Sequence, residues 1–390
     1  MTDNHGIYLD YQATTPMDPR VLEAMLPYFT ALGNPHSSRH DHGIAAMGAV
    51  DAARAQVAAL IGAHPDEIVF TSGATEADNL AIKGALASSD RTGIVTLATE
   101  HHAVLDVVLA EGRRGAATKI VGVDADGFAD LGALSNVVDD NTALVSVMAA
   151  NNEIGVIQPL AEVARIASNA GALFHTDAAQ AIGKIPFDVV ITGANLASLS
   201  SHKVYGPTGI GALYISRDAS RRISPIIEGG GQERGFRSGT LPVALCVGFG
   251  EACRISAEVM EQEADQLRRL RTAFVERLSE TGAAFQVNGT MDARLPGNIN
   301  VSFDGVDAEA LLMRLRGKVS VASGSACTSD SLAPSHVVMA LGFGQDRAEE
   351  AIRIGFGRTT TLDEVLTAAS TMGEAVAKLR RVGYNRIKGD

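Results

Sequence analysis

Residues 143–180 read ALVSVMAANNEIGVIQPLAEVARIASNAGALFHTDAAQ, and this stretch decides the fold. It starts with an apolar run (143–149), passes through a polar turn and a segment of helical period (161–171), and ends in a second apolar run (172–177). A strand, a helix and a strand in succession make a parallel pair joined by a crossover helix. Both runs are apolar at nearly every position, which is typical of strands buried on both faces. The stretch therefore predicts an α/β fold with helices on both sides of a sheet.

The same alternation continues from about residue 45 to residue 255. Further apolar runs that we interpret as strands cover residues 67–70, 93–99, 119–123, 196–200 and 211–216. Together with the first two they predict a mainly parallel sheet of seven strands in a large domain. In a sheet of this kind, ligands bind at the carboxyl ends of the strands.

The composition of the chain changes at residues 256–282, which form a charged segment with an apolar stripe at helical spacing. We interpret this segment as the arm that leads to a second, smaller α/β domain. That domain would contain strands near FQVNG, NINVSF, VSVAS and IRIGF and a C-terminal helix. The predicted domains are residues 16–258 for the large one, and residues 1–15 with residues 259–390 for the small one. A chain of 390 residues is long enough for two such domains.

The charge balance and the N-terminus exclude several classes of protein. The chain has 33 basic and 45 acidic residues and a formal charge of −12, which argues against a nucleic-acid-binding surface. Its first residues, MTDNHGIYLDY, contain no basic region and no apolar run, so they do not predict a secretory signal. No apolar run approaches the length that a bilayer span requires. We therefore expect a cytoplasmic protein with neither nucleic acid nor membrane as its partner.

The three cysteines show neither metal-ligand spacing nor a disulfide pattern, so no structural metal site is predicted. Cys246 and Cys253 lie on one side of a probable helix, where core packing explains both. Cys327 differs, because it lies in VASGSACTSDS (321–331), among small and polar residues. We expect this stretch to be a solvent-facing, mobile loop, which is an unusual place for a structural cysteine.

A lysine and an aspartate follow two of the predicted strands. Lys203 comes just after residues 196–200, and partial desolvation there would suit a lysine that forms a Schiff base. Asp177 ends residues 172–177. Pyridoxal phosphate requires a lysine of this kind and a carboxylate for its ring nitrogen. The alternatives are a solvated surface lysine and an aspartate that caps the next helix.

A phosphate site is predicted where strand 67–70 gives way to a helix. The turn Ser72-Gly73-Ala74-Thr75 offers backbone N–H groups and a hydroxyl at a helix N-terminus, which suits a dianion. The alternative is a plain capping box, T-E-A-D. Polar residues also follow two more strands, in TEHHAVLD (99–106) and NNEIGVIQP (151–159), and they would face the same crevice.

At this point the chain resembles a known family, the pyridoxal-phosphate-dependent cysteine desulfurases of the NifS/IscS type, in the class V aminotransferase family. The motifs that carry the resemblance are TSGATEADNLAIKG (71–84), TEHHAVLD, NNEIGVIQP, HTDAAQAIGK (175–184), SSHKVYGPTGIGALY (200–214), ERGFRSGTLP (233–242) and SGSACTS (323–329). The resemblance extends from YLDYQATTP (8–16) to IRIGFGRTTT (352–361), which is essentially the whole chain. It implies the type I fold of pyridoxal-phosphate-dependent transferases, and pyridoxal 5'-phosphate as cofactor.

By position, the resemblance implies a set of cofactor-binding residues. They are Ala74, Thr75, His101, Asn152, Asp177, Gln180, Ser200, His202, Lys203 and Thr240. Lys203 would link to the cofactor and remove the Cα proton of the substrate, Asp177 would pair with the pyridine nitrogen, and Gln180 would bond the ring oxygen. His101 would stack on the ring and move protons. In the family the threonine of RSGT reaches the phosphate across a subunit boundary, so Thr240 implies a homodimer.

For the substrate, the resemblance implies L-cysteine, with Asn152 and Arg353 on its carboxylate; Arg358 is a rival for the arginine. The catalytic residues would be Lys203, His101 and Cys327, whose thiolate would take the sulfur as a persulfide and leave alanine. The sulfur would then pass to an iron–sulfur scaffold or another acceptor protein, with Cys327 as a possible transient ligand of the cluster. Gln232 stands where the family has histidine.

Two other functions remain open on the sequence. One is another pyridoxal enzyme of the same fold, such as a selenocysteine lyase or an aminotransferase, which would share Lys203, Asp177 and the phosphate site, so that only Cys327 and its loop discriminate. The other is a binding module without catalytic activity, against which stands a chemically competent residue at every proposed functional position.

Overall fold

The large sheet of the protein has seven strands in the order β2-β8-β7-β6-β5-β3-β4. The structure is a computed structural model and describes residues 6–324 and 334–387. The strands are β2 (Ile68–Thr71), β3 (Gly93–Leu97), β4 (Ala117–Val121), β5 (Thr142–Ser146), β6 (Leu173–Asp177), β7 (Leu196–Ser200) and β8 (Gly211–Ile215). All neighbours are parallel except those of β8, which runs antiparallel to both β2 and β7. The predicted seven-stranded, mostly parallel sheet is confirmed.

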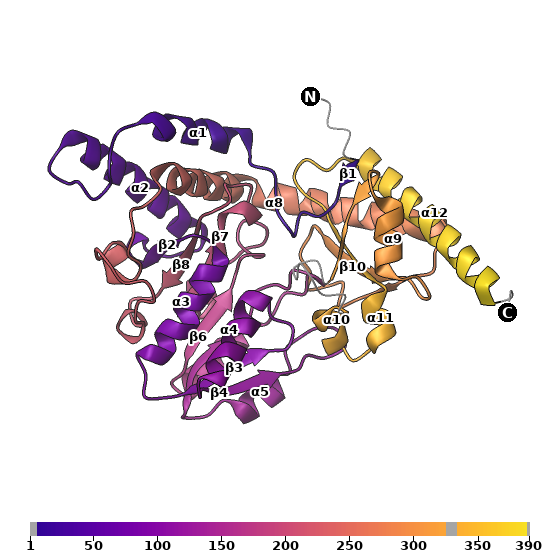
Figure 1. The fold of residues 1–390 in the computed structure, drawn as a ribbon, viewed down its shortest axis with the longest axis horizontal. Coiled ribbons are helices and arrows are strands. Elements are labelled where there is room, and N and C mark those ends of the chain that lie inside the picture. The colour runs from indigo at the N-terminus through magenta and orange to yellow at the C-terminus, as the bar shows by residue number, and fades with distance from the viewer. Residues whose placement is uncertain (1–5, 325–333, 388–390) are drawn as a thin grey trace.

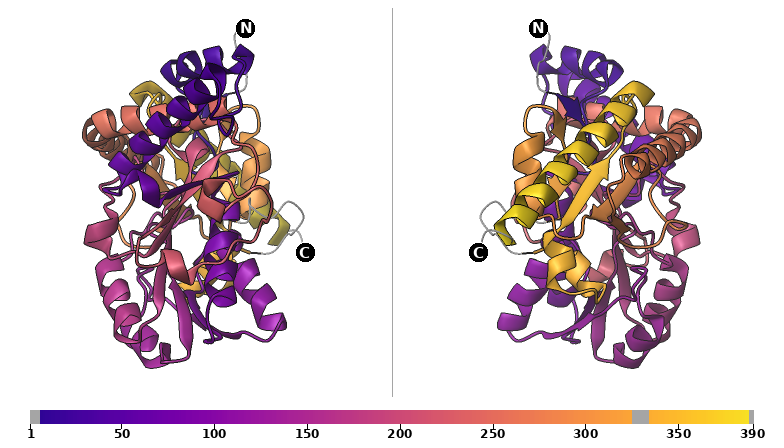
Figure 2. Two further views of the ribbon diagram at one scale, coloured as in Figure 1. Left: turned by 90° about the vertical axis from the view of Figure 1, so that its left-hand side faces the viewer. Right: turned by 90° about the vertical axis from the view of Figure 1, so that its right-hand side faces the viewer.

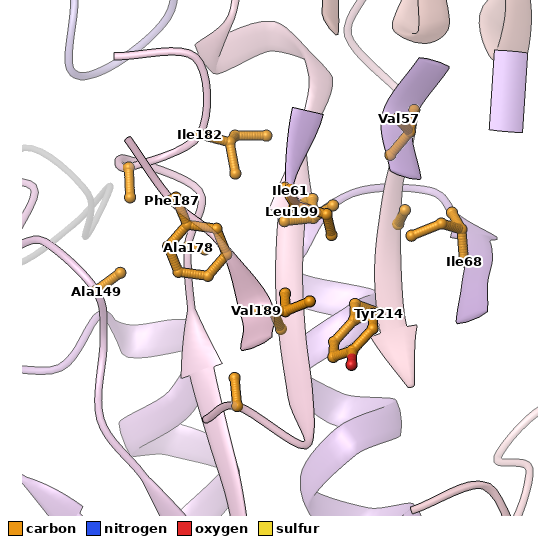
Figure 3. Close-up of a cluster of buried hydrophobic side chains, with 14 of the residues drawn as sticks. Val57, Ile61, Ile68, Ala149, Ala178, Ile182, Phe187, Val189, Leu199 and Tyr214 are labelled. Atoms are coloured by element: carbon orange, nitrogen blue, oxygen red, sulfur yellow. The ribbon is translucent and has the colours of Figure 1, made fainter. Parts of the chain in front are cut away.

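Helices cover both faces of this sheet. The helices of this half of the chain are α1 (Pro19–Thr30), α2 (Asp41–Leu60), α3 (Ala74–Ala87), α4 (His102–Arg113), α5 (Leu131–Val137), α6 (Leu160–Asn169), α7 (Val189–Thr192) and α8 (Val243–Glu280). Along β5, Leu144 packs with α3 and α4, whereas Val145 packs on the other face with α2, α6 and α8. Figure 3 shows part of the core that contains Val145, in which Val57 of α2 and Ile61, just after α2, lie near Ile68, Leu199 and Tyr214 of the sheet. Burial on both faces explains why the strands are apolar at nearly every position.

A second group of elements contains a four-stranded antiparallel sheet with the order β12-β13-β10-β9. Its members are β9 (Gln286–Val287), β10 (Asn298–Ser302), β12 (Ala322–Ser323) and β13 (Ala351–Gly355), with the helices α9 (Ala308–Leu315), α10 (His336–Ala340), α11 (Gln345–Glu349) and α12 (Leu362–Ile387). Beside it β1 (Ile7–Tyr8) pairs in parallel with β11 (Val319–Ser320). Leu9 is buried in the same core as Phe274 of α8 and Val365 of α12. The N-terminal residues therefore pack with the C-terminal part of the chain, while the exact domain boundaries stay a prediction.

Helix α8 connects the two cores. It is one helix of 38 residues, so the segments around Cys246 and around residues 256–282 are continuous. Gly248 and Gly250 lower the helix propensity of its first turns, but a side chain there would collide with Met25 of α1 and with Ala53 of α2. Figure 1 shows α8 passing from the layer beside α1 and α2 to α9 and α12, and the right-hand view of Figure 2 shows α12 next to it.

Two predictions from the cysteines can be compared with the structure. Cys246 and Cys253 are fully buried in the core between α8 and the large sheet, as predicted. The expectation of a solvent-facing loop is wrong for Ala322 and Ser323, because they form β12 and pair with β13. Cys327 lies outside the described residues. In the described part of the chain, none of the helices has the combination of length and apolar character that crossing a membrane requires.

A buried ion pair holds the loop between β8 and α8. Both guanidinium Nη atoms of Arg54 on α2 bond the carboxylate of Glu233 at 2.7 Å, and Glu233 also accepts from the N–H of Phe70 at 2.6 Å. Glu233 and Arg234 have φ values of 49° and 56°, a strained conformation for residues other than glycine. The ion pair fixes a turn that the local sequence does not favour.

We expect Glu233→Gln to destabilise the protein by about 3 kcal/mol, because it leaves the Arg54 guanidinium buried without its counter-charge. The control is Glu280→Gln, which removes the partner of Arg277 in an exposed pair and should change stability by less than about 0.5 kcal/mol. Urea unfolding of the three proteins measures the difference. Equal losses in the two variants would show that the buried pair has no special role in stability.

Candidate active site

A cavity of about 480 Å³ lies at the carboxyl ends of the parallel strands. Nine of the ten residues predicted to bind a cofactor line it: Ala74, Thr75, His101, Asn152, Asp177, Gln180, Ser200, His202 and Lys203. They come from five different strand ends or helix starts of the large sheet. The volume is within the range of sites for small ligands. The fold thus brings together residues that are up to 129 positions apart, from Ala74 to Lys203.

One end of the cavity is the N-terminus of α3, which is open to an anion. Gly73 is the N-cap and offers no side chain, and the N–H groups of Ala74 and Thr75 have no partner among the described residues. The alternative of a T-E-A-D capping box is wrong, because the helix already begins at Ala74. Instead, Glu76 bonds the N–H of Ser72 at 2.8 Å. Free N–H groups and the helix dipole make this end suitable for a phosphate.

Gly211 of β8 makes this turn possible. A Cβ atom at Gly211 would lie 2.7 Å from Cα of Gly73 and 2.4 Å from the carbonyl oxygen of Leu199. No side chain fits at that distance, so only glycine lets the strand approach the phosphate turn closely.

Lys203 follows β7 in a short 3-10 turn (Ser201–Lys203) and is directed inward. Its Nζ donates to the carbonyl oxygens of Gln12 at 2.6 Å and Ala13 at 2.7 Å. The alternative of a solvated surface lysine is therefore wrong. The N-terminal segment supplies the backbone acceptors that hold this amine at the cavity.

Asp177 is the last residue of β6 and lines the cavity. Its carboxylate also accepts a local backbone hydrogen bond, as a capping residue would. Its Oδ1 accepts from the N–H of Ala179 at 2.9 Å, although no regular helix begins there. Burial raises the pKa of Asp177, while the Ala179 N–H and the charge of Lys203 oppose that shift. A cationic nitrogen in front of this carboxylate would stabilise its charged form further.

Behind Asp177 lies a buried polar chain that sequence reasoning missed. His175 bonds Ser146 through Nδ1 at 2.8 Å and Ser198 through Nε2 at 2.9 Å, and Asp78 lies 3.5 Å from Nε2. Burial and the charge of Asp177 raise the pKa of Asp78 well above its usual range. Two features of the sequence could have revealed this polar chain. His175 lies inside the otherwise apolar strand that ends in HTD, and Asp78 lies on the apolar face of the helix that contains EADNLA.

The cavity keeps its histidines neutral. Burial and the nearby charge of Lys203 lower the pKa of His101 to about 4, and they lower the pKa of His202 to about 4 as well. Nδ1 of His101 accepts from the N–H of Ala103 at 3.1 Å, as the N-cap of α4. In the neutral ring the proton therefore sits on Nε2.

Of the two candidate arginines, Arg353 is the one close to the cavity. It lies on β13 with 1% of its side chain exposed, donates to Asp10 at 2.8 Å and reaches the carbonyl of the cavity residue Asn152 at 3.3 Å. Arg358 bonds Asp18 and Glu263, both at 2.8 Å, and its guanidinium lies 4.0 Å from the centre of the Tyr205 ring. Those contacts give Arg358 a structural task.

Thr240 is not in this cavity. It is exposed on the loop that Glu233 anchors, and Arg237 of the same loop bonds Glu76 of α3 at 2.8 Å. Gln232 accepts from the N–H of Gly239 through its Oε1, so Gln232 shapes the turn next to Thr240. Among the described residues, no group of three or more His, Cys, Asp and Glu side chains is arranged to hold a metal ion.

The site fits pyridoxal phosphate in its donor set. It offers an anion cup at α3, an amine at Lys203, a carboxylate at Asp177 and an amide at Gln180 around one cavity. These are the groups that the phosphate, the aldehyde, the ring nitrogen and the ring oxygen of that cofactor require. The arrangement can hold an aromatic anion and place a base beside it.

Comparisons with known proteins agree with this geometry. The family model described as aminotransferase class-V matches residues 7–367. A protein named cysteine desulfurase IscS from Rickettsia felis is 48% identical over 382 residues, which are 97% of this chain and 93% of that one. A solved structure titled NIFS-like protein superposes with a TM-score of 0.88 at 37% identity, over 95% of this chain and 99% of that one. The apo structure of a cysteine desulfurase from Thermococcus onnurineus NA1 gives 0.84 at 28% identity, over 96% of each chain.

Glu153, next to Asn152, gives the site a pH-dependent contribution to stability. It is buried, its carboxylate accepts from Ser335, and burial raises its pKa to about 7 although Ser335 and Arg353 oppose the shift. In the unfolded chain this carboxyl loses its proton near its usual value of 4.5. Between the two values the folded state binds more protons, so this residue makes stability fall as pH rises.

Glu153→Gln should remove that contribution, since glutamine keeps the acceptor for Ser335 but does not titrate. Between pH 5.5 and 8, we expect the free energy of unfolding of the variant to fall by about 2 kcal/mol less than that of the unmodified protein. Urea titrations at a series of pH values measure both slopes. Parallel curves for the two proteins would mean that Glu153 is ionised in the folded state.

Proposed function

The chain belongs to the class-V aminotransferase family, and on that premise we propose that it is a pyridoxal-phosphate-dependent cysteine desulfurase. It converts L-cysteine to L-alanine and moves the sulfur to Cys327 as a persulfide. The observation that carries the proposal is the cavity in which Lys203, Asp177 and the N-terminus of α3 meet, in a chain similar over nearly its full length to a cysteine desulfurase.

Different residues of the cavity would bind different groups of the cofactor. The backbone N–H groups of Ala74 and Thr75, with Ser200 and His202, would hold the phosphate, and Asp177 would hold the ring nitrogen. When bound, pyridoxal phosphate would supply an electron-withdrawing ring that weakens the bonds at Cα of the attached amino acid. His101 would contact the cofactor through a neutral imidazole whose Nε2 carries the proton.

The substrate is held through its carboxylate. Arg353 presents a guanidinium fork, which matches a planar carboxylate, and Asp10 keeps the fork in place through its Nη2. Asn152 supplies the amide next to it. With the carboxylate fixed, Lys203 accepts the Cα proton on Nζ, and His101 donates and regains a proton at Nε2.

The sulfur transfer balances without an external oxidant. The thiolate of Cys327 attacks the sulfur of the substrate, so an S–S bond forms while the C–S bond breaks with its electron pair left on carbon. That carbon takes up a proton and becomes the methyl group of alanine. The sulfur atoms are oxidised to the persulfide level as the carbon is reduced. A thiolate carrier requires a reducing compartment, in keeping with the predicted cytoplasmic location.

A homodimer belongs to this proposal because Thr240 lies outside its own chain's cavity. The loop that carries it is exposed but firmly anchored by the Arg54–Glu233 and Arg237–Glu76 pairs. On α1, Leu26 and Phe29 are 56% and 61% exposed. Exposed apolar side chains of this size favour contact with another protein surface. In a dimer, Thr240 would complete the phosphate site of the partner, and the persulfide would pass to an iron–sulfur scaffold or another acceptor.

We expect Cys327→Ala to bind the cofactor normally but to lose at least ~100-fold of its alanine and sulfide production from L-cysteine, because the sulfur has no acceptor. Alanine and sulfide are measured with a reductant present, and the persulfide by alkylation and mass spectrometry. The matched control is Cys246→Ala. Burial raises the pKa of Cys246 to about 12, so its thiol is unreactive and its loss should leave turnover intact.

The alternatives give different products. A selenocysteine lyase would release alanine from L-selenocysteine in the Cys327→Ala variant at the rate of the unmodified protein and none from L-cysteine in either. An aminotransferase would form a keto acid in place of alanine. A binding module without activity would show no turnover at all. Any of these results would overturn the proposal.

Arg353→Lys should lower kcat/KM for L-cysteine roughly 10- to 100-fold, mainly through KM, because a lysine loses the second hydrogen bond to the carboxylate. The matched variant is Arg358→Lys, which disturbs the contacts with Asp18 and Glu263 and should lower thermal stability but leave KM within about threefold. The reverse pattern would assign the substrate carboxylate to Arg358. Steady-state kinetics and thermal unfolding of the two variants decide the matter.

A further inference from the structure

Lys184 is a partly buried amine beside the cavity that has no role in the function proposed above. Its Nζ donates to Oε1 of Gln180 at 2.7 Å. Among the described residues, no carboxylate lies within ion-pairing distance of it. Burying a charged amine costs free energy, and a hydrogen bond to a neutral amide offsets that cost less than an ion pair would. The position of Lys184 therefore needs an explanation.

The turn after β6 sets this contact. Ala178 and Ile182 are fully buried in the core (Figure 3), and the N–H groups of Ile182 and Ile185 bond the carbonyls of Ala178 and Ala181. Gly183, with a φ of 66°, interrupts the helical geometry before Lys184. The turn nevertheless brings the Lys184 side chain against that of Gln180.

The amide of Gln180 is held at both of its ends. Lys184 donates to Oε1, while Nε2 donates to the carbonyl oxygen of Gln12 at 2.9 Å, the same oxygen that Nζ of Lys203 reaches at 2.6 Å. An ammonium group only donates, so Oε1 must face Lys184 and Nε2 must face Gln12. Nε2 has a second hydrogen without an acceptor among the described residues, and Gln180 lines the cavity.

We propose that Lys184 is a positioning residue that fixes and polarises the Gln180 amide, so that Nε2 donates into the cavity to an anionic oxygen of the bound ligand. The inference rests on the proposed function, in which that oxygen belongs to the ring of pyridoxal phosphate. A cation on Oε1 draws electrons from the amide and strengthens its N–H donors. Gln180 alone could turn either end toward the ligand, since its two ends are nearly the same in shape.

The charges around Lys184 support a ligand-dependent role. Burial, together with the charges of Lys203 and Arg353, lowers the pKa of Lys184 to about 7, while the charge of Glu263 opposes the shift. An anion bound in the cavity raises the pKa again, which favours the ammonium form. The amide is therefore held most firmly when an anionic ligand is present.

The linkage between Lys203 and the cofactor reports on this contact through its absorbance. Deprotonation of the linkage leaves the negative charge of the ring oxygen unbalanced, and a donor to that oxygen stabilises the deprotonated form. Weakening the donor should therefore raise the pKa of the linkage. We expect Lys184→Met to raise it by roughly one unit, the size of one hydrogen bond to a charged group.

The experiment is a spectrophotometric pH titration of the purified, cofactor-loaded protein without substrate. Three single variants are compared, namely Lys184→Met, Lys184→Arg and Gln180→Ala. A double variant combines Gln180→Ala with Lys184→Met. Arginine keeps a donor and a charge, so the pKa rise in Lys184→Arg should be at most half of the rise in Lys184→Met. The control is Lys378→Met, an exposed lysine that pairs with Glu374 on α12 and should cause no shift. Circular dichroism and thermal unfolding of each variant establish that it is folded.

The double variant separates orientation from simple charge. If Lys184 acts through Gln180, Lys184→Met causes a much smaller shift in the Gln180→Ala background than in the unmodified one. An equal shift in both backgrounds would mean that only the charge of Lys184 matters and would overturn the proposal, as would no shift in either. If the unmodified protein, mixed with pyridoxal phosphate, shows no absorbance band of the bound cofactor, the proposed function fails, and that result is distinct from a failed test of Lys184.

Discussion

The whole structure depends on the burial of the large sheet on both faces. Neighbouring residues of β5, Leu144 and Val145, pack into different cores, so neither face of the strand tolerates a charge. Polar groups inside the strands, such as His175 and Ser198, bond one another, whereas the polar side chains that line the cavity are placed where the strands end. Because the parallel strands end at one edge, these side chains are collected at a single cavity. The chemistry of the site is thus a consequence of how the apolar residues are covered.

The N-terminal segment closes this cavity on one side. Leu9 belongs to the core of the smaller sheet, Asp10 holds Arg353, and the carbonyls of Gln12 and Ala13 receive Lys203. Five consecutive residues therefore connect the second core, the arginine and the lysine. A backbone carbonyl is a fixed acceptor with no rotamer to lose, so it positions a flexible lysine at little entropic cost. This segment makes the two halves of the molecule into one site.

Desolvation sets the charge state of the cavity. Burial lowers the pKa values of His101, His202 and Lys184 and raises that of Asp78, while Arg353 and Lys203 provide the positive charge. A dianion that enters meets unpaired N–H groups at α3 and has few charged competitors. Its own charge then raises the pKa of the surrounding bases. The cavity without ligand is thus prepared to change its protonation when an anion binds.

The sequence by itself determined the fold class and the seven strands, and nine of the ten residues that it predicted for the cofactor do line the cavity. The spacing of apolar residues and the polar residues that follow each apolar run are local properties of the chain, so the sequence alone reveals them. Only the tertiary structure showed what binds the two arginines: Asp10 for Arg353, and Asp18 and Glu263 for Arg358, all more than 90 positions from the arginine that they bind. Likewise, HTD gave no sign that His175 connects two serines beside Asp78, nor did GGGQERG reveal that Glu233 reaches back to Arg54. A buried polar group is defined by the partner that satisfies it, and that partner comes from a distant segment that only folding brings near.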